Sequence, residues 1–573
     1  MHKIKKDLNN AFKIINIMEK LWFKNWPPNL TYKLGYPSVT VDKIFEKSAE
    51  FYSKKNFMIY YDKYITYEDG WISILGLAQT LYELKLKKGD RVGIYMQNSP
   101  NFVISYFGII RAGGIAVLMN PMLKKDEINY IVEDSGLKII ITTGELINNL
   151  MDSAKKYDLK IIAGNLKDYL PDNSEIPIPP ELNKIYDIHE AYQWQEAIKY
   201  KGNGINVDRD SEDWAMIAYT SGTTGIPKGC IHTNRSIIAN ALDSAYWRGV
   251  TSSTVELSVA PFFHVTGLSF SVLGPIYEGA TMVVLSRWNK IAAIKAIEKY
   301  KVTHWVSVPT MIADLLSYPD IDKVDFSSLR FIGGGGAAMP KPLLERFENL
   351  IHLPFIEGYG MTEMMGQTHV NPTHKRKSGS IGIPQFGVDA KIIDWQNGRE
   401  LGPNEIGEIV FTGPSQFSGY YNKKRDTEEA FVEINDKKYL RSGDIGYMDE
   451  DGYFFVVDRL KRMINRGGFK VWPLEVENVL YSHKAIKECC VISTPDERVG
   501  EEVKALIVLK DEYKGKITED EIIKYCKERL ADYKYPRVIE FTDEILKTGS
   551  GKIDWRKMQE IEKKKNLKRS VKK

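Results

Sequence analysis

Helical and strand-like hydrophobic patterns alternate along the first two thirds of the chain. Residues 41–52 and 71–84 carry apolar side chains at helical spacing, whereas 57–60 and 91–96 are short apolar runs bounded by turn residues. The same alternation resumes after residue 214. Elements in this order predict an α/β domain built on parallel sheets.

From about residue 380 short strands separated by glycine and proline turns predict a β-barrel-like subdomain that extends to residue 457. The remainder, 458–573, mixes strands with charged helices and has the size of a small separate domain. We therefore predict a mixed α/β fold. A large N-terminal domain, 1–457, holds two parallel-rich α/β sheets and the β-rich subdomain, and a small mobile α+β domain, 458–573, follows. The last eleven residues hold seven Lys and Arg, so we expect a frayed, solvated tail there.

Residues 1–30 carry apolar side chains at helical spacing with lysines and asparagines between them. This pattern predicts an amphipathic lead-in helix that Pro27-Pro28 ends. Two interpretations stay open: docking on the chain's own domain, which we favour, and weak contact with a membrane surface. No stretch predicts a secretory signal or a transmembrane span, because the longest apolar run, 102–120, is broken by Arg111 and Gly113-Gly114.

Composition narrows the class of protein without identifying it. The 573 residues hold 79 Lys and Arg against 75 Asp and Glu, and this balance argues against a dedicated nucleic-acid binder. The length exceeds what one hydrophobic core organises, so two or more domains are expected. The cysteines match neither a zinc quartet nor a disulfide framework, which favours a reducing, cytoplasmic compartment. They are Cys230, Cys489, Cys490 and Cys526.

The most informative stretch is a loop rich in glycine and hydroxyl residues, 219–229. It follows the apolar run 214–218, a predicted strand, and precedes 236–242, a predicted helix start. Backbone N–H groups and hydroxyls in such a loop converge on an anion, so we predict a phosphate cradle. No Gly-Lys-Ser/Thr occurs, so this is not a Walker A loop. Its candidate residues are Thr220, Ser221, Gly222, Thr223, Thr224, Gly225 and Lys228.

Further motifs follow this loop in a set order. They are Pro-Phe-Phe-His at 261–264, four glycines at 333–336, Tyr-Gly-Met-Thr-Glu at 359–363, Ser-Gly-Asp at 442–444, Asp-Arg-Leu-Lys at 458–461, Gly-Gly-Phe-Lys at 467–470 and Thr-Gly-Ser-Gly-Lys at 548–552. The series closely resembles the adenylate-forming superfamily, which contains acyl-CoA synthetases, the adenylation domains of peptide synthetases and firefly luciferase. The resemblance runs from about residue 40 to 556.

The resemblance implies an acyl-CoA synthetase with a two-step reaction. A carboxylate attacks the α-phosphorus of ATP to give acyl-AMP and pyrophosphate, and CoA then displaces AMP. Charge develops on phosphate oxygens in the first step, which requires positioned cations and N–H donors. Thr220 and Glu363 are implied to hold Mg²⁺, because one hydroxyl and one carboxylate leave positions for phosphate oxygens and water. Lys552 is implied to contact the attacking carboxylate and the α-phosphate.

The same resemblance assigns the nucleoside. Asp444, assisted by Arg459, would accept the ribose hydroxyls. Tyr359 would stack on the adenine, with glycine backbone on the other face. The remaining residues of the ATP or AMP site would be Gly335, Gly336, Ala337, Glu357, Gly358, Gly360 and Thr362.

For the second step the resemblance implies that the small domain rotates about a hinge at Asp458. The strand that begins at Gly467 would then line a tunnel for the pantetheine arm of CoA. The residues implied to line this tunnel are Gly467, Gly468, Phe469 and Lys470.

The acid itself is only partly constrained by the sequence. Acetate-specific relatives have Trp at the position of Gly360, so this glycine is expected to leave space for a longer acid. Some long-chain members close an acyl tunnel with a Trp four residues after the His, and Leu268 occupies that position here. Medium- or long-chain fatty acids, short hydroxy acids and aryl acids all stay open. The candidate pocket residues are His264, Leu268, Gly336, Gly360 and Trp247, with His264 beside the substrate or thioester.

The sequence leaves alternatives for the acyl acceptor, and it departs from the family pattern near Lys552. About twenty residues follow Lys552, from which we expect a free-standing enzyme that uses CoA rather than a ligase that delivers to a carrier protein or an amine. Two positions depart from the family pattern. Leu546 stands where the family usually has Pro, and Trp555 stands where Arg is expected, with Arg556 one place later. The sequence does not assign an oligomeric state.

Overall fold

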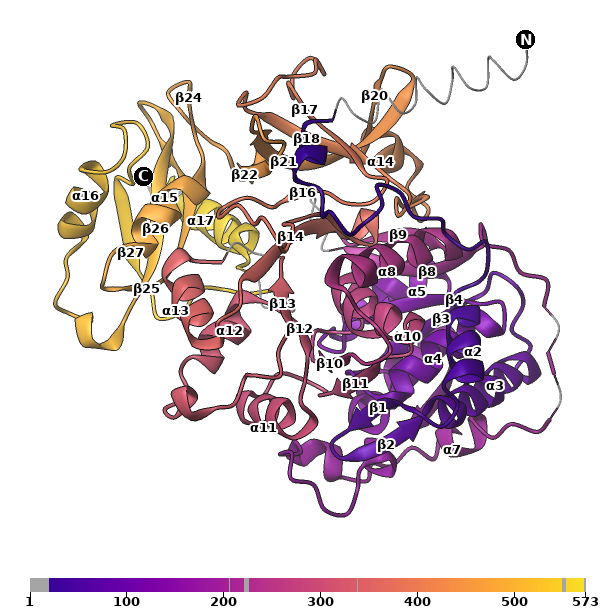
Figure 1. Ribbon diagram of the computed structural model, residues 1–573. Helices are drawn as coiled ribbons and strands as arrows, with labels where there is room; N and C mark the ends of the chain where they lie inside the picture. Colours follow the sequence, from indigo (N-terminus) through magenta and orange to yellow (C-terminus); the bar gives the residue numbers. More distant parts are fainter. Residues whose placement is uncertain are drawn as a thin grey trace, which may run out of the picture.

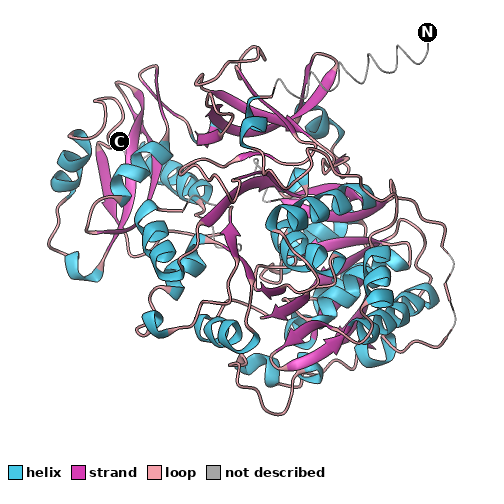
Figure 2. Cartoon of the chain, viewed as in Figure 1, coloured by secondary structure: helices cyan, strands magenta, loops and turns pink. Residues whose placement is uncertain are grey.

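The computed structural model describes residues 20–202, 204–205, 207–220, 226–336, 339–548 and 553–570 (Figure 1). Its strands form four sheets, and helices pack around them (Figure 2). The mixed α/β fold predicted from the sequence is confirmed.

An eight-stranded sheet carries the predicted phosphate loop. Its order is β19-β9-β8-β4-β3-β5-β6-β7, and all neighbours are parallel except β8–β9 and β9–β19. Parallel strands end at one edge of a sheet, so the end of β8 lies beside the ends of β4 and β3. The strands are β3 (Arg91–Tyr95), β4 (Ile115–Met119), β5 (Ile139–Thr143), β6 (Lys160–Gly164), β7 (Tyr192–Gln193), β8 (Trp214–Thr220), β9 (Lys228–Thr233) and β19 (Gly419–Tyr420).

A nine-stranded sheet carries the glycine run and the Tyr-Gly-Met-Thr-Glu motif. Its order is β16-β15-β14-β13-β12-β10-β11-β1-β2, with parallel pairing from β14 to β1 and antiparallel strands at both edges. The strands are β1 (Asn56–Tyr60), β2 (Lys63–Thr66), β10 (Val255–Ser258), β11 (Thr281–Val284), β12 (His304–Ser307), β13 (Phe331–Gly334), β14 (Phe355–Met361), β15 (Gly366–Val370) and β16 (Ile383–Pro384).

The helices of this part begin at recognisable sequence signals. Thr66 and Asp69 form a capping box, which starts α3 at Tyr67, four residues before the predicted position. Ser99 caps α4 with its hydroxyl on the Phe102 amide. The helices are α2 (Asp42–Phe51), α3 (Tyr67–Glu83), α4 (Pro100–Arg111), α5 (Lys125–Ser135), α6 (Met151–Tyr157), α7 (Trp194–Ala197), α8 (Asn234–Arg248), α9 (Val265–Leu268), α10 (Gly274–Tyr277), α11 (Lys290–Tyr300), α12 (Pro309–Leu315), α13 (Lys341–Ile351) and α14 (Lys424–Glu429).

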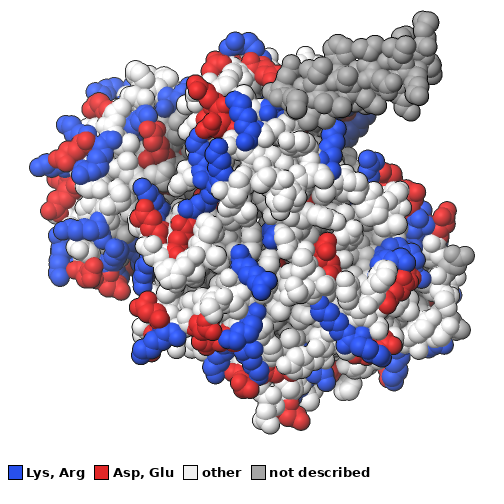
Figure 3. Space-filling view, viewed as in Figure 1, with Lys and Arg blue, Asp and Glu red and all other residues white. Residues whose placement is uncertain are grey.

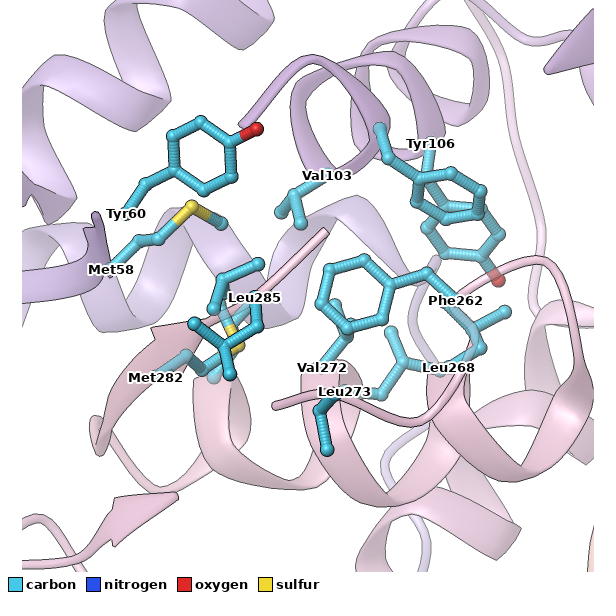
Figure 4. Close-up of a cluster of buried hydrophobic side chains, with 14 of the residues drawn as sticks. Met58, Tyr60, Val103, Tyr106, Phe262, Leu268, Val272, Leu273, Met282 and Leu285 are labelled. Carbon is cyan, nitrogen blue, oxygen red and sulfur yellow. The ribbon is translucent and has the colours of Figure 1, made fainter. Parts of the chain in front are cut away.

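The largest hydrophobic core joins residues of both sheets. Phe262 and Leu268 are fully buried in it, close to Val103 of α4 and Leu285 (Figure 4). Complete burial of a side chain of this size contributes roughly 1.5–3 kcal/mol. The segment that carries the Pro-Phe-Phe-His motif is therefore held on both sides by apolar packing.

The predicted β-rich subdomain is an antiparallel sheet of five strands. Its order is β17-β18-β21-β20, and β22 also pairs with the long strand β21. This pairing places Asp444 of β21 directly opposite Arg459 of β22. The strands are β17 (Asp389–Ile393), β18 (Gly407–Thr412), β20 (Phe431–Ile434), β21 (Lys437–Met448) and β22 (Phe454–Arg459).

The C-terminal region, yellow in Figure 1, has a sheet and a hydrophobic core of its own. The sheet order is β24-β23-β26-β25, and β27 pairs with β26. Its elements are β23 (Ile464–Arg466), β24 (Phe469–Val471), α15 (Pro473–Tyr481), β25 (Ile486–Asp496), β26 (Gly500–Leu509), α16 (Glu519–Lys527), β27 (Val538–Phe541) and α17 (Trp555–Ser570).

The prediction of a frayed tail is wrong for the described part of it. Helix α17 continues to Ser570 and docks on β25 and β26. Glu562 accepts from Lys504 at 2.6 Å, and Asn566 donates to Thr494 at 3.2 Å. These polar anchors lie on a helix whose C-terminal half is rich in Lys and Arg, a composition that predicts a solvated segment from sequence alone. The final three residues lie outside the described part of the chain.

The predicted lead-in helix falls mainly on residues 1–19, outside the described residues. The described stretch forms a short 3₁₀ helix, Leu21–Asn25, in which Trp22 is buried against Phe454 at 6.1 Å between ring centroids. Within the described residues no helix is long and apolar enough to cross a membrane. On the face shown in Figure 3 basic and acidic side chains are interspersed.

Candidate active site

The predicted phosphate loop joins two antiparallel strands. Thr220 ends β8 and pairs in register with Lys228, the first residue of β9. Strand β9, which was not predicted, lies between the loop and the predicted helix 236–242; this helix is α8, which begins at Asn234 and is capped by Thr233. The β9 residues are short or polar enough to resemble a loop in sequence. Residues 221–225 of the loop, five of its seven candidate residues, lie outside the described residues.

Lys228 lies within a small network of side chains. Its Nζ forms an ion pair with Asp426 of α14 and lies 5.1 Å from the centroid of the Tyr420 ring. The Tyr420 hydroxyl donates to Glu363 Oε1 at 2.7 Å. The network thus connects the phosphate-loop lysine with the carboxylate predicted to hold Mg²⁺. Sequence reasoning did not identify Tyr420 or Asp426, since both lie in a charged, aromatic turn segment without a distinctive pattern.

Glu363 is positioned by a 3₁₀ turn that follows β14. Its side chain is buried, and burial raises its pKa above the ordinary value. The turn is fixed by His232, whose Nε2 donates to the Thr362 carbonyl at 2.8 Å, and by the Phe417 amide, which donates to the Glu363 carbonyl at 2.8 Å. A buried carboxylate that accepts one hydroxyl keeps oxygen lone pairs for a cation.

Among the described residues no group of three or more His, Cys, Asp or Glu side chains could hold a metal ion by itself. A protein-only cage is thus absent from the described part of the chain. Mg²⁺ is typically bound through one or two protein oxygens together with phosphate oxygens and water. Glu363 and the Thr220 hydroxyl fit such a partial site, and Thr220 Oγ1 donates a long hydrogen bond, 3.4 Å, to the Lys228 carbonyl.

The glycine run and the β14–β15 hairpin approach each other through their backbones. A Cβ atom at Gly335 would lie 2.3 Å from the Gly358 carbonyl oxygen, and Gly336 has φ of +84°. Both positions therefore require glycine. The neighbouring Glu357 is partly buried, and burial raises its pKa. Ala337 lies outside the described residues.

Gly360 is glycine for a reason other than the one expected. A Cβ atom there would lie 1.7 Å from the Gly366 carbonyl oxygen across the hairpin, so no side chain fits this backbone arrangement. The expectation that this glycine leaves pocket space at its side-chain position is not met, because backbone fills that space. Gly360 is exposed on its other side.

Replacement of Gly360 by alanine is expected to destabilise the protein by about 1–3 kcal/mol, because one strand of the hairpin must shift. The shift would also displace Glu363, so the adenylation rate should fall. Urea unfolding and pyrophosphate release measure the two effects. Gly35→Ala is the matched control, since nothing lies within 4 Å of a Cβ there. Equal stability of the two variants would show that the hairpin accommodates a side chain.

Asp444 lies where three segments of the chain meet. The carboxylate accepts from Arg459 Nε at 2.6 Å on one oxygen and from the Tyr359 hydroxyl on the other. Burial, and then the Asp444 charge, raise the pKa of Tyr359 far above its usual value, so its proton is held. The structure thus brings together Asp444, Arg459 and Tyr359, three of the residues that the sequence assigned to the nucleoside.

His264 caps a helix beside the buried core. Its Nδ1 accepts from the Thr266 amide at 3.2 Å at the start of α9, which leaves the proton of a neutral ring on Nε2. Leu268 is fully buried at the end of that helix, and a π-helical turn, Ser269–Leu273, follows it. Helix interruptions of this kind are frequent at functional sites.

Trp247 occupies a second hydrophobic cluster. Its ring contacts Trp26 and Phe386 edge to face at 5.2 and 5.6 Å between centroids. Its Nε1 donates to the Asn371 carbonyl at 3.3 Å. The ring thus has packing and hydrogen-bond partners within the protein. Its assignment to the acid pocket stays a prediction.

The predicted hinge residue is tied to the C-terminal region. Asp458 is buried and accepts from the Arg459 and Leu474 amides, each at 2.6 Å. Burial raises its pKa to about 6. The loop predicted to line the CoA tunnel lies at the surface, where Phe469 is 59% exposed and stacks on Tyr533.

The start of α17 lies on the side of the C-terminal region that faces the site. Burial and the nearby charge of Arg459 lower the pKa of Arg556, and burial and the charge of Lys228 lower the pKa of Lys461. These pKa shifts show that Arg556 and Lys461 lie close enough to Arg459 and Lys228 for their charges to interact. Lys552 itself lies outside the described residues.

Comparison with known proteins gives matches across almost the whole chain. Residues 45–421 match the family described as AMP-binding enzyme, and residues 475–552 match the AMP-binding enzyme C-terminal domain. The long-chain-fatty-acid–CoA ligase of Bacillus subtilis (strain 168) is 36% identical over 558 residues, which cover 95% of this chain and 98% of the relative. A feruloyl-CoA synthase of an Amycolatopsis species is 34% identical over 495 residues, or 85% of this chain and 92% of the relative.

Among solved structures, the ATP-bound MatB from Rhodopseudomonas palustris superposes with a TM-score of 0.81. The match covers 91% of this chain and 99% of that one at 24% identity, which is evidence for the fold alone.

Proposed function

The chain belongs to the AMP-binding enzyme family and is an ATP-dependent, AMP-forming acyl-CoA ligase, and we propose that the acid it activates is a long-chain fatty acid. The observation that carries this proposal is the 36% identity to a long-chain-fatty-acid–CoA ligase over 95% of the chain. The segment after His264 supports it, because this segment enters the apolar core rather than a polar pocket (Figure 4). An alkyl chain gains binding energy only from such an environment.

We propose the following roles in adenylation. Lys228 and the phosphate loop bind the β- and γ-phosphates, and Asp444 accepts the ribose hydroxyls. Lys552 stabilises negative charge as the acid's carboxylate oxygen bonds to the α-phosphorus and pyrophosphate leaves. Glu363 and Thr220 would hold Mg²⁺, which supplies positive charge to the phosphate oxygens when bound.

In the second step the CoA sulfur attacks the acyl carbonyl, loses its proton, and displaces AMP. We propose that residues 1–457 and 458–573 act as two domains that rotate at Asp458 for this step. The exposed position of the loop at Gly467 supports this proposal, since a surface loop can be brought to the site by rotation. The Asp458 amide contacts would move with the C-terminal domain, because Leu474 belongs to it.

The acid, ATP and CoA are the partners that this activity requires. We propose a cytoplasmic enzyme. The four cysteines support this location, since all are buried and none forms a disulfide.

A substrate panel tests the proposed acid class. Pyrophosphate release is measured with acetate, octanoate, palmitate, 3-hydroxybutyrate and ferulate, each with and without CoA. Each buried CH₂ contributes about 0.8 kcal/mol, so kcat/KM for palmitate should exceed that for octanoate by at least about tenfold. Higher kcat/KM with ferulate would assign an aryl acid instead, the class named for the Amycolatopsis relative. Pyrophosphate release that CoA never accelerates would point to a carrier protein or an amine as acceptor.

A further inference from the structure

We propose that Asp426 is a positioning residue that competes with phosphate for Lys228 and thereby promotes the release of pyrophosphate. The inference rests on the assignment of Lys228 to the ATP phosphates proposed above. It concerns a residue outside every motif of the sequence analysis. Asp426 lies on α14, and nothing in its local pattern separates it from the other charged residues of that helix.

The ion pair between Lys228 and Asp426 differs from the other pairs of α14. The Lys228 side chain is 14% exposed and that of Asp426 34%, whereas Arg425 and Glu429 pair at 90% and 61% exposure. Water weakens an exposed pair to almost nothing, and a partly buried pair retains more of its energy. Of these paired residues on the helix, Asp426 is therefore the one whose charge can act on a phosphate bound at Lys228.

The fold fixes Asp426 relative to Lys228. Strand β19 pairs with β9, which begins at Lys228, and the Tyr420 amide at the end of β19 donates to Thr427 Oγ1 at 2.9 Å. Gly419 packs so closely on Thr427 that a Cβ there would lie 2.8 Å from its Cγ2. Asp426 thus stands on a turn clamped to the strand that carries the lysine.

The same segment is also linked, through Asp134 of α5, to Tyr219 at the first end of the phosphate loop. The Asn422 side chain donates to the Asp134 carbonyl at 3.2 Å. Tyr219, next to the loop, donates to the Asp134 carboxylate at 2.7 Å. Since residues 419–427 pair with β9 directly and reach Tyr219 through Asp134, we expect Asp426 to keep its place when phosphate binds.

The chemistry of the reaction gives this carboxylate a function. A Lys ammonium has three donors, and every bond that it makes to Asp426 is one that a phosphate oxygen must share or displace. Pyrophosphate leaves with more charge than it carried within ATP, so a site made only of cations retains it. A carboxylate that pairs with Lys228 again when the phosphate leaves lowers the affinity of the site for both ATP and pyrophosphate. The charges of Glu363 and Lys461 also interact with that of Lys228, whereas Asp426 forms an ion pair with it.

The test measures the inhibition constant for pyrophosphate and the KM for ATP in Asp426→Asn. Both constants are expected to fall by about three- to tenfold, the range expected for one partly buried ion pair. Asp426→Glu should restore values near those of the unchanged enzyme. Glu429→Gln removes an exposed charge from the same helix and should change neither constant. A purely structural role of Asp426 would raise both constants, the opposite sign, and would overturn the proposal.

The variant Lys228→Met tests the phosphate-binding role of Lys228 separately from the role of Asp426. If it leaves the affinities for ATP and pyrophosphate unchanged, the assignment of Lys228 to phosphate is wrong and the inference fails with it. If Lys228→Met weakens the binding of both ATP and pyrophosphate while Asp426→Asn has no effect, only the inference about Asp426 fails. The inference predicts that Asp426→Asn loses its effect in the Lys228→Met background, because the two residues act as one pair.

Discussion

Replacement of Lys552 by alanine is expected to slow acyl-adenylate formation by about a hundred- to a thousandfold. The reason is that a fixed ammonium stabilises charge which develops only as the carboxylate attacks the α-phosphorus. The rate at which supplied acyl-AMP and CoA are converted to acyl-CoA should change by less than about threefold, because this negative charge does not develop in that step. The two half-reactions are measured separately by pyrophosphate release and by thioester formation.

The described residues on either side of Lys552 support this expectation. Lys547 and Ile553 form an antiparallel bridge that closes the loop, and α17 anchors its far end through Glu562. Lys547→Ala is the matched control, since its Nζ pairs with Glu488 at 2.6 Å on the surface. If this control slowed adenylation as much as Lys552→Ala, the effect would belong to loop geometry rather than to the Lys552 charge. Equal loss of both half-reactions would also contradict the proposed role.

The elements with strong periodicity could be predicted from the sequence, and the errors have physical causes. The range 57–60 lies in β1 and 91–96 contains β3, because buried parallel strands are short apolar runs with few alternatives. Strand β9 was missed, since only its pairing with β8 and β19 makes a strand of Lys-Gly-Cys-Ile-His-Thr. The last eleven residues, which include the end of α17, were predicted to be a tail because the contacts that anchor this helix on β25 and β26 are tertiary.

The candidate site likewise contains residues that the sequence predicted and residues that only the fold reveals. Asp444, Arg459 and Tyr359 lie in separate motifs, and the structure brings them into contact, while their roles in binding the nucleoside stay a prediction. Tyr420 and Asp426 could not be predicted, because their importance arises from the turn that places them against Glu363 and Lys228. Motifs report the residues that contact ligands directly. The residues that orient those groups become visible only in the fold.

Replacement of Glu363 by glutamine is expected to lower kcat/KM for ATP in adenylation by about a hundredfold and to raise the Mg²⁺ requirement by at least about tenfold. The change keeps the shape of the side chain and its acceptor for the Tyr420 hydroxyl, but removes the charge. Stability should not decrease at neutral pH. Burial raises the pKa of Glu363, which means that the folded protein bears a cost for the charged form, and glutamine removes that cost.

The pH dependence distinguishes this explanation from a general loss of structure. If the carboxylate form is required, adenylation by the unchanged enzyme must fall as the pH drops through the raised pKa of Glu363, where the side chain takes up a proton. Glu363→Gln has no such group, so this part of its pH profile should disappear. Glu345→Gln, on the exposed face of α13 and 3.8 Å from Lys341, is the matched control and should keep full activity with an unchanged profile. A Glu363→Gln enzyme with normal Mg²⁺ dependence would place the metal on other ligands, even if its activity were low.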